Sequence, residues 1–273
     1  MSVKIISEIG INHNASLDIT KKLIDLAAFT GCDYVKFQKR TPALCVPENQ
    51  KNKPKDTPWG VMTYLEYKER MEFGEVEYKE IDAYCQSHKI SWFASVWDLP
   101  SCDFMKNFVK IGKIPSALIT NLELCDYARK CFDFLIISTG MSTEEEIEKA
   151  VEVAKPDVIM HTNSNYPALS EELNLNYIKH LQNKYPKIVA GYSGHEFGLI
   201  ATMVAVALGA EWIERHITLR RTMWGSDQMA SIEPHGLMKL VKGIHSVESA
   251  MGNGGPRQVL GNELKKRESL RGV

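Results

Sequence analysis

Short apolar runs alternate with longer amphipathic segments along the whole chain. In the longer segments apolar residues recur three and four positions apart, as at Leu23, Ile24 and Ala27, which is typical of a helix packed on a core. The short runs are bounded by turn residues, which indicates strands. They lie at Val3–Ile9, Asp33–Gln38, Ile90–Val96, Val109–Ile114, Phe134–Ser138, Val158–His161, Ile188–Tyr192 and Trp212–Ile217. This alternation predicts an α/β protein, a single (β/α)8 TIM barrel.

Capping residues support the helices of this pattern. Ser16 can cap a helix that is expected to end near Gly31. Ser142 and Thr143 precede the acidic turn Glu144–Glu146, and acidic residues favour a helix N-terminus. The last amphipathic pattern, Leu237–Met251, supplies the eighth helix.

One segment is too long for an ordinary connection. Between about residues 41 and 74 the chain carries four prolines and the aromatic residues Trp59, Tyr64, Tyr67 and Phe73. Connections of this length are usually functional covers or insertions, so we expect a long insertion after the second strand. Its aromatic residues either pack the insertion, which is the more common use, or form a stacking platform. Residues 1–273 are otherwise expected to form one domain.

Composition narrows the expected partner to a small molecule. The 33 basic and 34 acidic side chains nearly cancel, so no overall field attracts nucleic acid or an anionic membrane. The N-terminus lacks the pattern of a signal peptide, and no stretch approaches the roughly 18 apolar residues of a membrane span. The six cysteines show no CxxC spacing, which favours reduced thiols. We therefore expect a cytoplasmic protein.

Polar residues interrupt the apolar strands close to their carboxyl ends, where the active site of such a barrel lies. The set comprises Glu8, Lys36, Gln38, Ser95, Lys113, Ser116, Ser138, His161, Ser164, Ser193, His195 and His216. A buried lysine is costly unless an anion compensates its charge, so Lys36 and Lys113 predict an anionic ligand. The hydroxyls would complete a cradle for phosphate and carboxylate groups, although each serine is equally suited to a turn or a cap.

His195 and His216 end the seventh and eighth strands, which are neighbours in a barrel. As neutral imidazoles they can share one divalent ion, and two protein ligands leave that ion open to polarise a substrate carbonyl. Either histidine taken alone is more simply a hydrogen-bonded interior residue. Glu8 has two interpretations, a salt bridge to Lys36 or a carboxylate that orients water or a substrate hydroxyl.

At these positions the chain resembles the sialic acid synthase family. The opening Ser7–Asn14 is followed by Val35–Gln38, and further motifs match in order over nearly the whole chain. They are Ile137–Met141, His161 with Tyr166–Pro167, Gly191–His195, Ala207–Ala210, Glu214–Leu219 and Ala230–Pro234. One such motif alone identifies a family weakly, but the occurrence of all of them in the same order along one barrel is specific to this family.

The resemblance implies a transferase that condenses phosphoenolpyruvate with an aldose, N-acetylmannosamine or a related amino sugar. C3 of phosphoenolpyruvate attacks the aldehyde, water adds at C2, and phosphate leaves by C–O cleavage, giving a 2-keto-3-deoxy sugar acid. The residues implied to hold phosphoenolpyruvate are Lys36, Ser95, Lys113, Ser116, Ser138 and Ser193, to which we add Ser164 from the strand ends.

The resemblance also assigns the acceptor and metal sites. Gln38, Tyr166 and Asp227 would bind the sugar, with Glu8 beside them as a catalytic carboxylate. His195 and His216 would be catalytic through a divalent metal, Mn²⁺ with Mg²⁺ or Co²⁺ as alternatives. A homodimer is expected from the resemblance alone.

Several positions depart from the family pattern. Leu118 replaces a carboxylate that would handle water or protons, and Gln228 follows Asp227 where the family has histidine. Ser95 keeps a hydroxyl at a threonine position. We also expect no antifreeze-like domain after the barrel, a domain that in the family reaches across a dimer with an arginine. Either the acceptor differs, or the insertion supplies the closing contacts.

Two other functions fit the same residues. One is condensation of phosphoenolpyruvate with a different or a phosphorylated sugar, as in the related octulosonate and heptulosonate phosphate synthases. Arg215, Arg220 and Arg221 would then bind the second phosphate. The other is a non-catalytic barrel that binds phosphoenolpyruvate or a sugar, for which Leu118 and the missing domain are the arguments.

Overall fold

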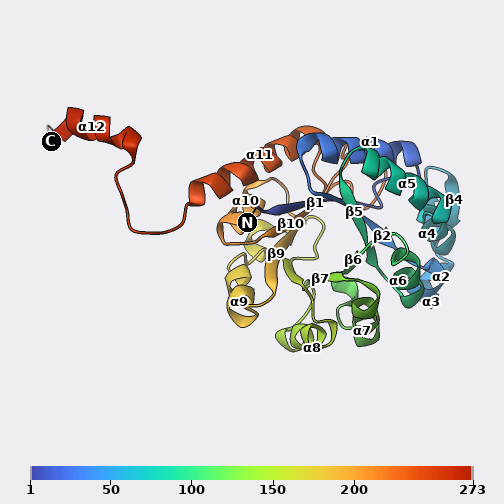
Figure 1. Ribbon diagram of the computed structural model, residues 1–273. Helices are drawn as coiled ribbons and strands as arrows, with labels where there is room; N and C mark the ends of the chain where they lie inside the picture. Colours follow the sequence, from blue (N-terminus) through green and yellow to red (C-terminus); the bar gives the residue numbers. More distant parts are fainter. Residues whose placement is uncertain (1, 272–273) are drawn as a thin grey trace.

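A closed barrel of eight parallel strands forms the centre of the computed structural model, which describes residues 2–271 (Figure 1). In order around the barrel the strands are β1 (Lys4–Gly10), β10 (Trp212–His216), β9 (Val189–Gly194), β8 (Val158–Thr162), β7 (Phe134–Ser138), β6 (Ile111–Ile114), β5 (Ser91–Val96) and β2 (Tyr34–Lys39). The predicted TIM barrel is confirmed. Its strands differ from the predicted ranges only at their ends, as at β6, which begins at Ile111 rather than Val109.

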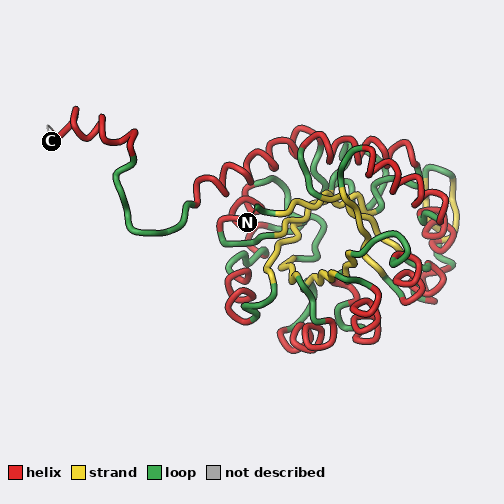
Figure 2. Tube along the Cα trace, viewed as in Figure 1, coloured by secondary structure: helices red, strands yellow, loops and turns green. Residues whose placement is uncertain are grey.

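Helices surround the ring of strands (Figure 2). They are α1 (Leu17–Thr30), α5 (Glu75–Ser87), α6 (Leu99–Met105), α7 (Leu122–Cys131), α8 (Glu144–Ala154), α9 (Tyr177–Lys184), α10 (Ile200–Ala207) and α11 (Pro234–Met251), with 3-10 turns at Ser116–Leu118 and Ser170–Glu172. In α1, Ser16 accepts a hydrogen bond from the Ile19 amide, and Gly31 ends the helix at a φ of 84°. Of the two candidate caps of α8, Thr143 caps the helix, in a capping box with Glu146.

Apolar side chains fill the space between the strands and the helices. Leu23 and Ile24 of α1 are fully buried, as their spacing in the sequence predicts. Burying a side chain of this size stabilises the fold by about 1.5–3 kcal/mol. The six cysteines are free thiols. No helix within residues 2–271 is long and apolar enough to cross a membrane.

The insertion after β2 has its own secondary structure. It contains α2 (Pro42–Cys45), α3 (Glu48–Lys51), an antiparallel hairpin of β3 (Pro54–Thr57) and β4 (Gly60–Thr63), and α4 (Tyr64–Met71). Tyr67 and Met71 of α4 are buried against Ile11, with Trp59 and Trp224 packed around them. Tyr67 and Trp224 meet edge to face, with ring centroids 5.3 Å apart. These aromatic residues therefore join the insertion to the loops at the carboxyl ends of β1 and β10.

The last helix, α12 (Gly261–Arg271), extends away from the barrel and has no buried residue (Figure 1). It follows an exposed linker at residues 252–260. The helix α12 therefore contributes no side chain to the core.

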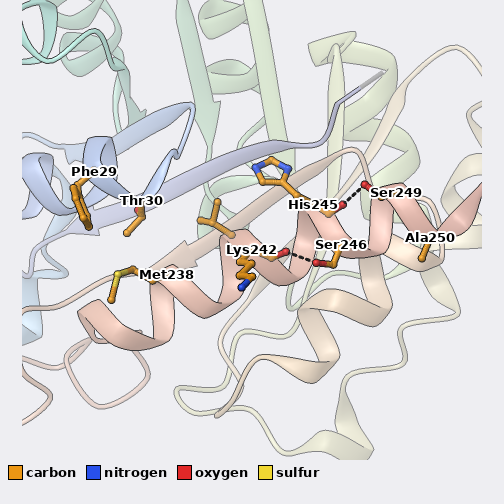
Figure 3. Close-up of a pocket in the computed structure, with 9 residues that line it drawn as sticks. Phe29, Thr30, Met238, Lys242, His245, Ser246, Ser249 and Ala250 are labelled. Carbon is orange, nitrogen blue, oxygen red and sulfur yellow. Dashed lines mark hydrogen bonds between the residues drawn. The ribbon is translucent and has the colours of Figure 1, made fainter.

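A groove of about 800 Å³ runs along the outside of the barrel between α1 and α11 (Figure 3). Phe29 and Met238 give it an apolar wall. Its hydroxyls are engaged within α11, where Ser246 and Ser249 donate to carbonyl oxygens one turn earlier at 2.8 and 2.9 Å. The groove lacks the converging polar groups of an active site.

Candidate active site

The polar strand-end residues surround a cavity of about 210 Å³ at the carboxyl ends of the barrel strands, called here the mouth cavity. Its lining includes the expected residues Glu8, Lys36, Gln38, Ser95, Lys113, Ser116, Ser138, Ser164, Tyr166, Ser193, His195 and His216. Asp227 does not line the cavity, but its Oδ2 lies 4.0 Å from His216 Nδ1. The expected residues are therefore brought together.

Strand alternation explains why these side chains meet. Successive residues of a strand point to opposite faces, so Lys36 and Gln38 share the inner face of β2 while Phe37 packs outward. Parallel pairing places Glu8 of β1 opposite Lys36 on one side and opposite His216 on the other. The register of three strands therefore fixes a carboxylate, an ammonium group and an imidazole at one level of the barrel.

The two lysines already have carboxylate partners, and the four charges alternate. Lys36 Nζ lies 2.7 Å from Glu8 Oε2 and 3.7 Å from Glu214 Oε1, and Lys113 Nζ lies 2.7 Å from Glu214 Oε1. All four side chains are at most 5% exposed. The salt bridge between Glu8 and Lys36, one of the two interpretations of Glu8, is present. The mouth cavity is thus close to electrically neutral before an anion enters.

Glu214 is the main residue that the sequence reasoning missed. Besides Lys113, it accepts a hydrogen bond from Ser193 Oγ at 3.1 Å. Burial alone would raise the pKa of this carboxyl, but the ammonium groups of Lys113 and Lys36 outweigh burial and lower the pKa. Glu214 precedes His216 by two positions, so strand alternation already implied that both face the barrel interior.

Glu8 has the opposite electrostatic balance. Burial raises its pKa despite the nearby Lys36, and the negative charge of Glu214 adds to the increase. Gln38 Nε2 donates to Glu8 Oε1 at 3.1 Å and orients the carboxyl group. Glu8 is therefore suited to exchanging a proton, whereas Glu214 is held as a carboxylate.

The two histidines both line the mouth cavity, with ring centroids 5.5 Å apart. The backbone oxygen of Asn163 lies 2.6 Å from His195 Nδ1 and can only accept, so Nδ1 carries the proton and Nε2 keeps a lone pair. Burial, and then His216, lower the pKa of His195 to about 3, so its ring is neutral near pH 7. His216 Nδ1 is buried without a hydrogen-bond partner.

This donor set fits a divalent metal with open positions. A ligating histidine usually donates its other ring N–H to a carbonyl or carboxylate, as His195 does to Asn163. Within residues 2–271, no group of three or more His, Cys, Asp or Glu side chains converges as a metal site. Two imidazole nitrogens would therefore leave most of the coordination sphere to substrate.

Hydroxyl groups converge opposite the histidines. Ser116 Oγ accepts from the Gly140 amide at 3.1 Å, and a Cβ on Gly140 would lie 2.2 Å from Ser164 Oγ. Only glycine therefore allows these serines to approach the chain. Ser138 Oγ is buried without a partner, so it is available to a ligand. Tyr166 covers the histidines, its ring centroid 4.0 Å from that of His195.

A second buried charge cluster lies behind the histidines, on the outer face of β10. Arg215 Nη1 lies 2.9 Å from Glu196 Oε1, and Nη2 donates to the Glu196 backbone oxygen at 2.6 Å. Thr202 and Tyr192 also donate to the Glu196 carboxylate, each at 2.9 Å. Because Arg215 precedes His216 and Glu196 follows His195, this pair holds the ends of β9 and β10 together.

Two expectations from the sequence are corrected by these positions. Arg215 points away from the mouth cavity into that outer cluster, and Arg220 and Arg221 do not line the cavity. Arg215, one of the three arginines expected to bind a second phosphate, is therefore already paired with Glu196. His161 also faces outward, where its Nε2 lies 2.6 Å from the Leu173 oxygen, because it precedes the inward-facing Thr162 by one residue.

Leu118 occupies the 3-10 turn after β6. It packs against the core and does not line the mouth cavity, whereas its neighbour Ala117 does. With leucine in place of the family's carboxylate at position 118, the turn after β6 therefore presents no carboxylate to the mouth cavity.

The comparisons with known proteins agree with this geometry. The NeuB family model matches residues 23–255. The N,N'-diacetyllegionaminic acid synthase of Campylobacter jejuni is 36% identical over 260 residues, covering 92% of this chain and 78% of that protein. The N-acetylneuraminate-9-phosphate synthase of Homo sapiens is 35% identical over 273 residues, covering 97% of this chain and 76% of that protein.

A solved structure shares the whole architecture. The N-acetylneuraminic acid synthetase of Leptospira borgpetersenii serovar Hardjo-bovis, in complex with citrate, is 33% identical with a TM-score of 0.87. The match covers 99% of this chain and 93% of that one. The chain therefore belongs to the NeuB family and is an enzyme of the sialic acid synthase type.

Proposed function

We propose that the enzyme condenses phosphoenolpyruvate with an open-chain 2-acetamido aldose, N-acetylmannosamine or a close relative, and releases phosphate. The observation that carries the proposal is the mouth cavity itself. Two lysines and a set of serine hydroxyls line it together with two imidazoles, of which His195 keeps Nε2 free while Nδ1 is bonded to Asn163, and His216 has an unpartnered Nδ1. The names of the relatives, N,N'-diacetyllegionaminic acid synthase and N-acetylneuraminate-9-phosphate synthase, support the same reaction.

Phosphoenolpyruvate binds by exchanging partners with the carboxylates. Lys36 and Lys113 turn from Glu8 and Glu214 toward the phosphate and carboxylate of the donor, each ammonium keeping contact with an anion. Ser95, which now accepts from Lys36 at 2.9 Å, moves with it. The remaining serine hydroxyls, with the unpartnered Ser138 Oγ among them, donate to the donor's oxygens.

His195 and His216 would hold a divalent metal, Mn²⁺ with Mg²⁺ or Co²⁺ as alternatives. When bound, such a metal supplies Lewis-acid polarisation of the acceptor's aldehyde. The neutral state of His195 and its bond to Asn163 prepare the ring for this role. Tyr166 and Asp227 bind the acceptor beside the histidines, with Gln38 on the other side.

C3 of phosphoenolpyruvate bonds to the aldehyde carbon, and water adds to C2 as it becomes electron-poor. Glu8 orients the water and takes one of its protons, a role that its raised pKa supports. This proton is passed on to the aldehyde oxygen, which becomes a hydroxyl. The bond between C2 and the phosphate oxygen then breaks, the second water proton leaves with the phosphate, and C2 becomes the ketone.

Free thiols support a further part of the proposal, a cytoplasmic location, because reduced cysteines are typical of that compartment. Fractionation of the source cells with an antibody to the protein tests this part separately. Recovery of the protein from a secreted fraction would contradict it.

The reaction is tested by incubating the full chain with Mn²⁺, phosphoenolpyruvate and a panel of aldoses in ¹⁸O-labelled water. We expect phosphate release that requires an aldose, with the label in the keto acid and none in the phosphate. His195→Ala should abolish release, while the surface variant Lys110→Met should not. Labelled phosphate, or release without an aldose, would contradict the mechanism.

A further inference from the structure

Arg40, the first residue after β2, is a buried cation next to the mouth cavity. Its side chain is 8% exposed, and its Nε lies 3.1 Å from Glu72 Oε1. The guanidinium carbon lies 4.4 Å from the ring centroid of Trp97, a residue that lines the mouth cavity. Arg40 itself does not line the cavity, so it can influence the reaction only through its neighbours.

Gln38 is the neighbour that connects Arg40 to the mouth cavity. Arg40 Nη2 donates to Gln38 Oε1, and Gln38 Nε2 donates to Glu8 Oε1 at 3.1 Å. A glutamine amide has one accepting oxygen and one donating nitrogen, whereas an arginine side chain offers donors only. The oxygen of Gln38 must therefore face Arg40, and this leaves its NH2 group to face Glu8.

The opposite orientation of the Gln38 amide would be unfavourable for Glu8. Gln38 Oε1 would then face Glu8 Oε1, and two accepting oxygens repel each other unless Glu8 carries a proton to donate. A protonated Glu8 cannot take a proton from water. Arg40 therefore selects the amide orientation in which Glu8 can act as the base of the proposed reaction.

Glu8 depends on Gln38 most when phosphoenolpyruvate is bound. In the ligand-free protein, Glu8 Oε2 also lies 2.7 Å from Lys36 Nζ. In the proposed reaction Lys36 turns toward the donor, so Gln38 is the partner that continues to hold Glu8. A reacting group must be held close to its productive geometry by neighbours that are themselves fixed. The contact between Arg40 and Gln38 meets this requirement.

The two ends of the insertion hold Arg40 in place. Glu72 follows α4, and its Oε2 accepts from the Arg40 amide at 3.2 Å while its Oε1 pairs with Arg40 Nε. Lys39 Nζ lies 3.6 Å from Glu72 Oε2 and donates to the Phe73 backbone oxygen at 2.7 Å. Trp97, just after β5, packs on the guanidinium group. Arg40 is therefore fixed by the base of the insertion.

We propose that Arg40 is a positioning residue, which fixes the amide of Gln38 and through it the carboxylate of Glu8 that receives the proton from water. This inference rests on the proposed function, because it concerns the base of that reaction. Glu72 then gives the insertion a part in orienting Glu8, although neither Arg40 nor Glu72 touches a substrate.

The first test measures kcat and KM of the full chain for phosphoenolpyruvate and the aldose, with Mn²⁺ present. Arg40→Met should lower kcat about 3- to 10-fold, the range for one net hydrogen bond, with a smaller change in the KM of phosphoenolpyruvate. Arg40→Lys keeps a donor-only group and should restore part of the loss. The control Arg70→Met removes an arginine of the same insertion that also stacks on a tryptophan, Trp59, at 4.5 Å, and should leave kcat unchanged.

A double-mutant cycle separates positioning from a general structural effect. Because Arg40 acts through Gln38, Arg40→Met should lower kcat much less in a Gln38→Leu background than in the wild-type protein. Additive losses, or an unchanged kcat in Arg40→Met, would overturn the inference and leave the proposed function standing. If Arg40→Met does not fold because Glu72 loses its partner, Arg40→Met combined with Glu72→Gln removes both charges, and the cycle is measured with that protein.

If no aldose is turned over, the proposed function fails, and NMR of ¹⁵N-labelled protein without substrates decides whether Arg40 fixes Gln38. The side-chain amide signals of Gln38 are assigned by their loss in Gln38→Leu. In Arg40→Met these signals should shift and exchange with water faster, and in Arg70→Met they should stay as in the wild-type protein. Unchanged Gln38 signals in Arg40→Met would overturn the inference.

Discussion

Two buried charge clusters flank β10, and they differ in how completely their charges are enclosed. On the inner face, Glu214 pairs with Lys113 beside a cavity. On the outer face, Arg215 pairs with Glu196 and is surrounded by protein donors and acceptors. The inner ions have an open side where a ligand can enter, and the outer ions have none. The successive residues Glu214 and Arg215 of β10 therefore differ in role. Glu214 faces a cavity that a ligand can enter, and Arg215 belongs to an enclosed structural cluster.

The largest effect should come from breaking the outer cluster. Arg215→Met leaves the Glu196 carboxylate buried without its ionic partner, and we expect a loss of about 3–5 kcal/mol in the free energy of unfolding. Urea titration followed by circular dichroism measures it. The control Arg129→Met breaks a half-exposed pair with Asp157 and should cost less than about 1 kcal/mol. Similar losses for both variants would show that burial does not distinguish the outer cluster.

Breaking the inner cluster should affect binding more than stability. Lys113→Met should weaken phosphoenolpyruvate binding, measured calorimetrically with Mn²⁺ present, by about 10- to 150-fold. Its stability loss should be smaller than that of Arg215→Met, because Lys36 remains 3.7 Å from Glu214. Unchanged phosphoenolpyruvate affinity would remove Lys113 from the donor site.

His13 is buried like the two charge clusters, but it is expected to stay neutral. His13 stacks on Phe73 with ring centroids 4.3 Å apart, and burial, then Arg40, lower its pKa to about 3. Its folded-state pKa is below the unfolded value of about 6.5, so the unfolded chain binds more protons between those values. Stability should therefore fall as pH decreases from 6.5, by at most about 1.4 kcal/mol per unit from this group.

His13→Phe should flatten that part of the stability curve, measured by urea titration at several pH values. The difference between the two proteins should vanish above pH 7.5, apart from a constant offset. Parallel curves from pH 7 to 4 would show that His13 does not stay neutral in the folded protein.

The smallest effects should come from a matched pair of hydroxyl deletions. Thr202→Val removes a donor to Glu196 at 2.9 Å in the outer cluster and should cost about 1–2 kcal/mol of stability. Ser193→Ala removes a donor to Glu214 at 3.1 Å, where a water molecule can replace it from the cavity, so we expect less than about 1 kcal/mol. It should weaken phosphoenolpyruvate binding instead. Equal stability losses would contradict the contrast between the clusters.

Much of the barrel could be predicted from local patterns. Strand positions followed from apolar runs, and the residues at their ends met because parallel strands place their carboxyl ends together. Two-residue spacing would also have assigned Glu214 inward and Arg215 outward, had it been applied to β10. Arg215 was misplaced because clustering in sequence was used without the side-chain direction.

Other features depend on contacts between distant segments and could not be predicted locally. The cavity lined by Tyr64, Tyr67 and Trp224 requires α4 and Trp224 to meet, although about 150 residues separate them, and each is placed by its own strand. The hairpin and helix of the insertion were not anticipated, because its prolines and irregularly spaced aromatic residues obscure periodicity. The pairing of Lys113 with Glu214 likewise joins β6 to β10, two strands that are not neighbours in the barrel.

The neutrality of the mouth cavity has a consequence for discrimination among metabolites. Because Lys36 and Lys113 are already satisfied by carboxylates, an incoming anion gains only the difference between its own contacts and those it displaces. An anion that contacts both lysines recovers more of that loss than an anion that contacts one of them. We therefore expect the ligand-free site to select metabolites with two anionic groups over metabolites with one.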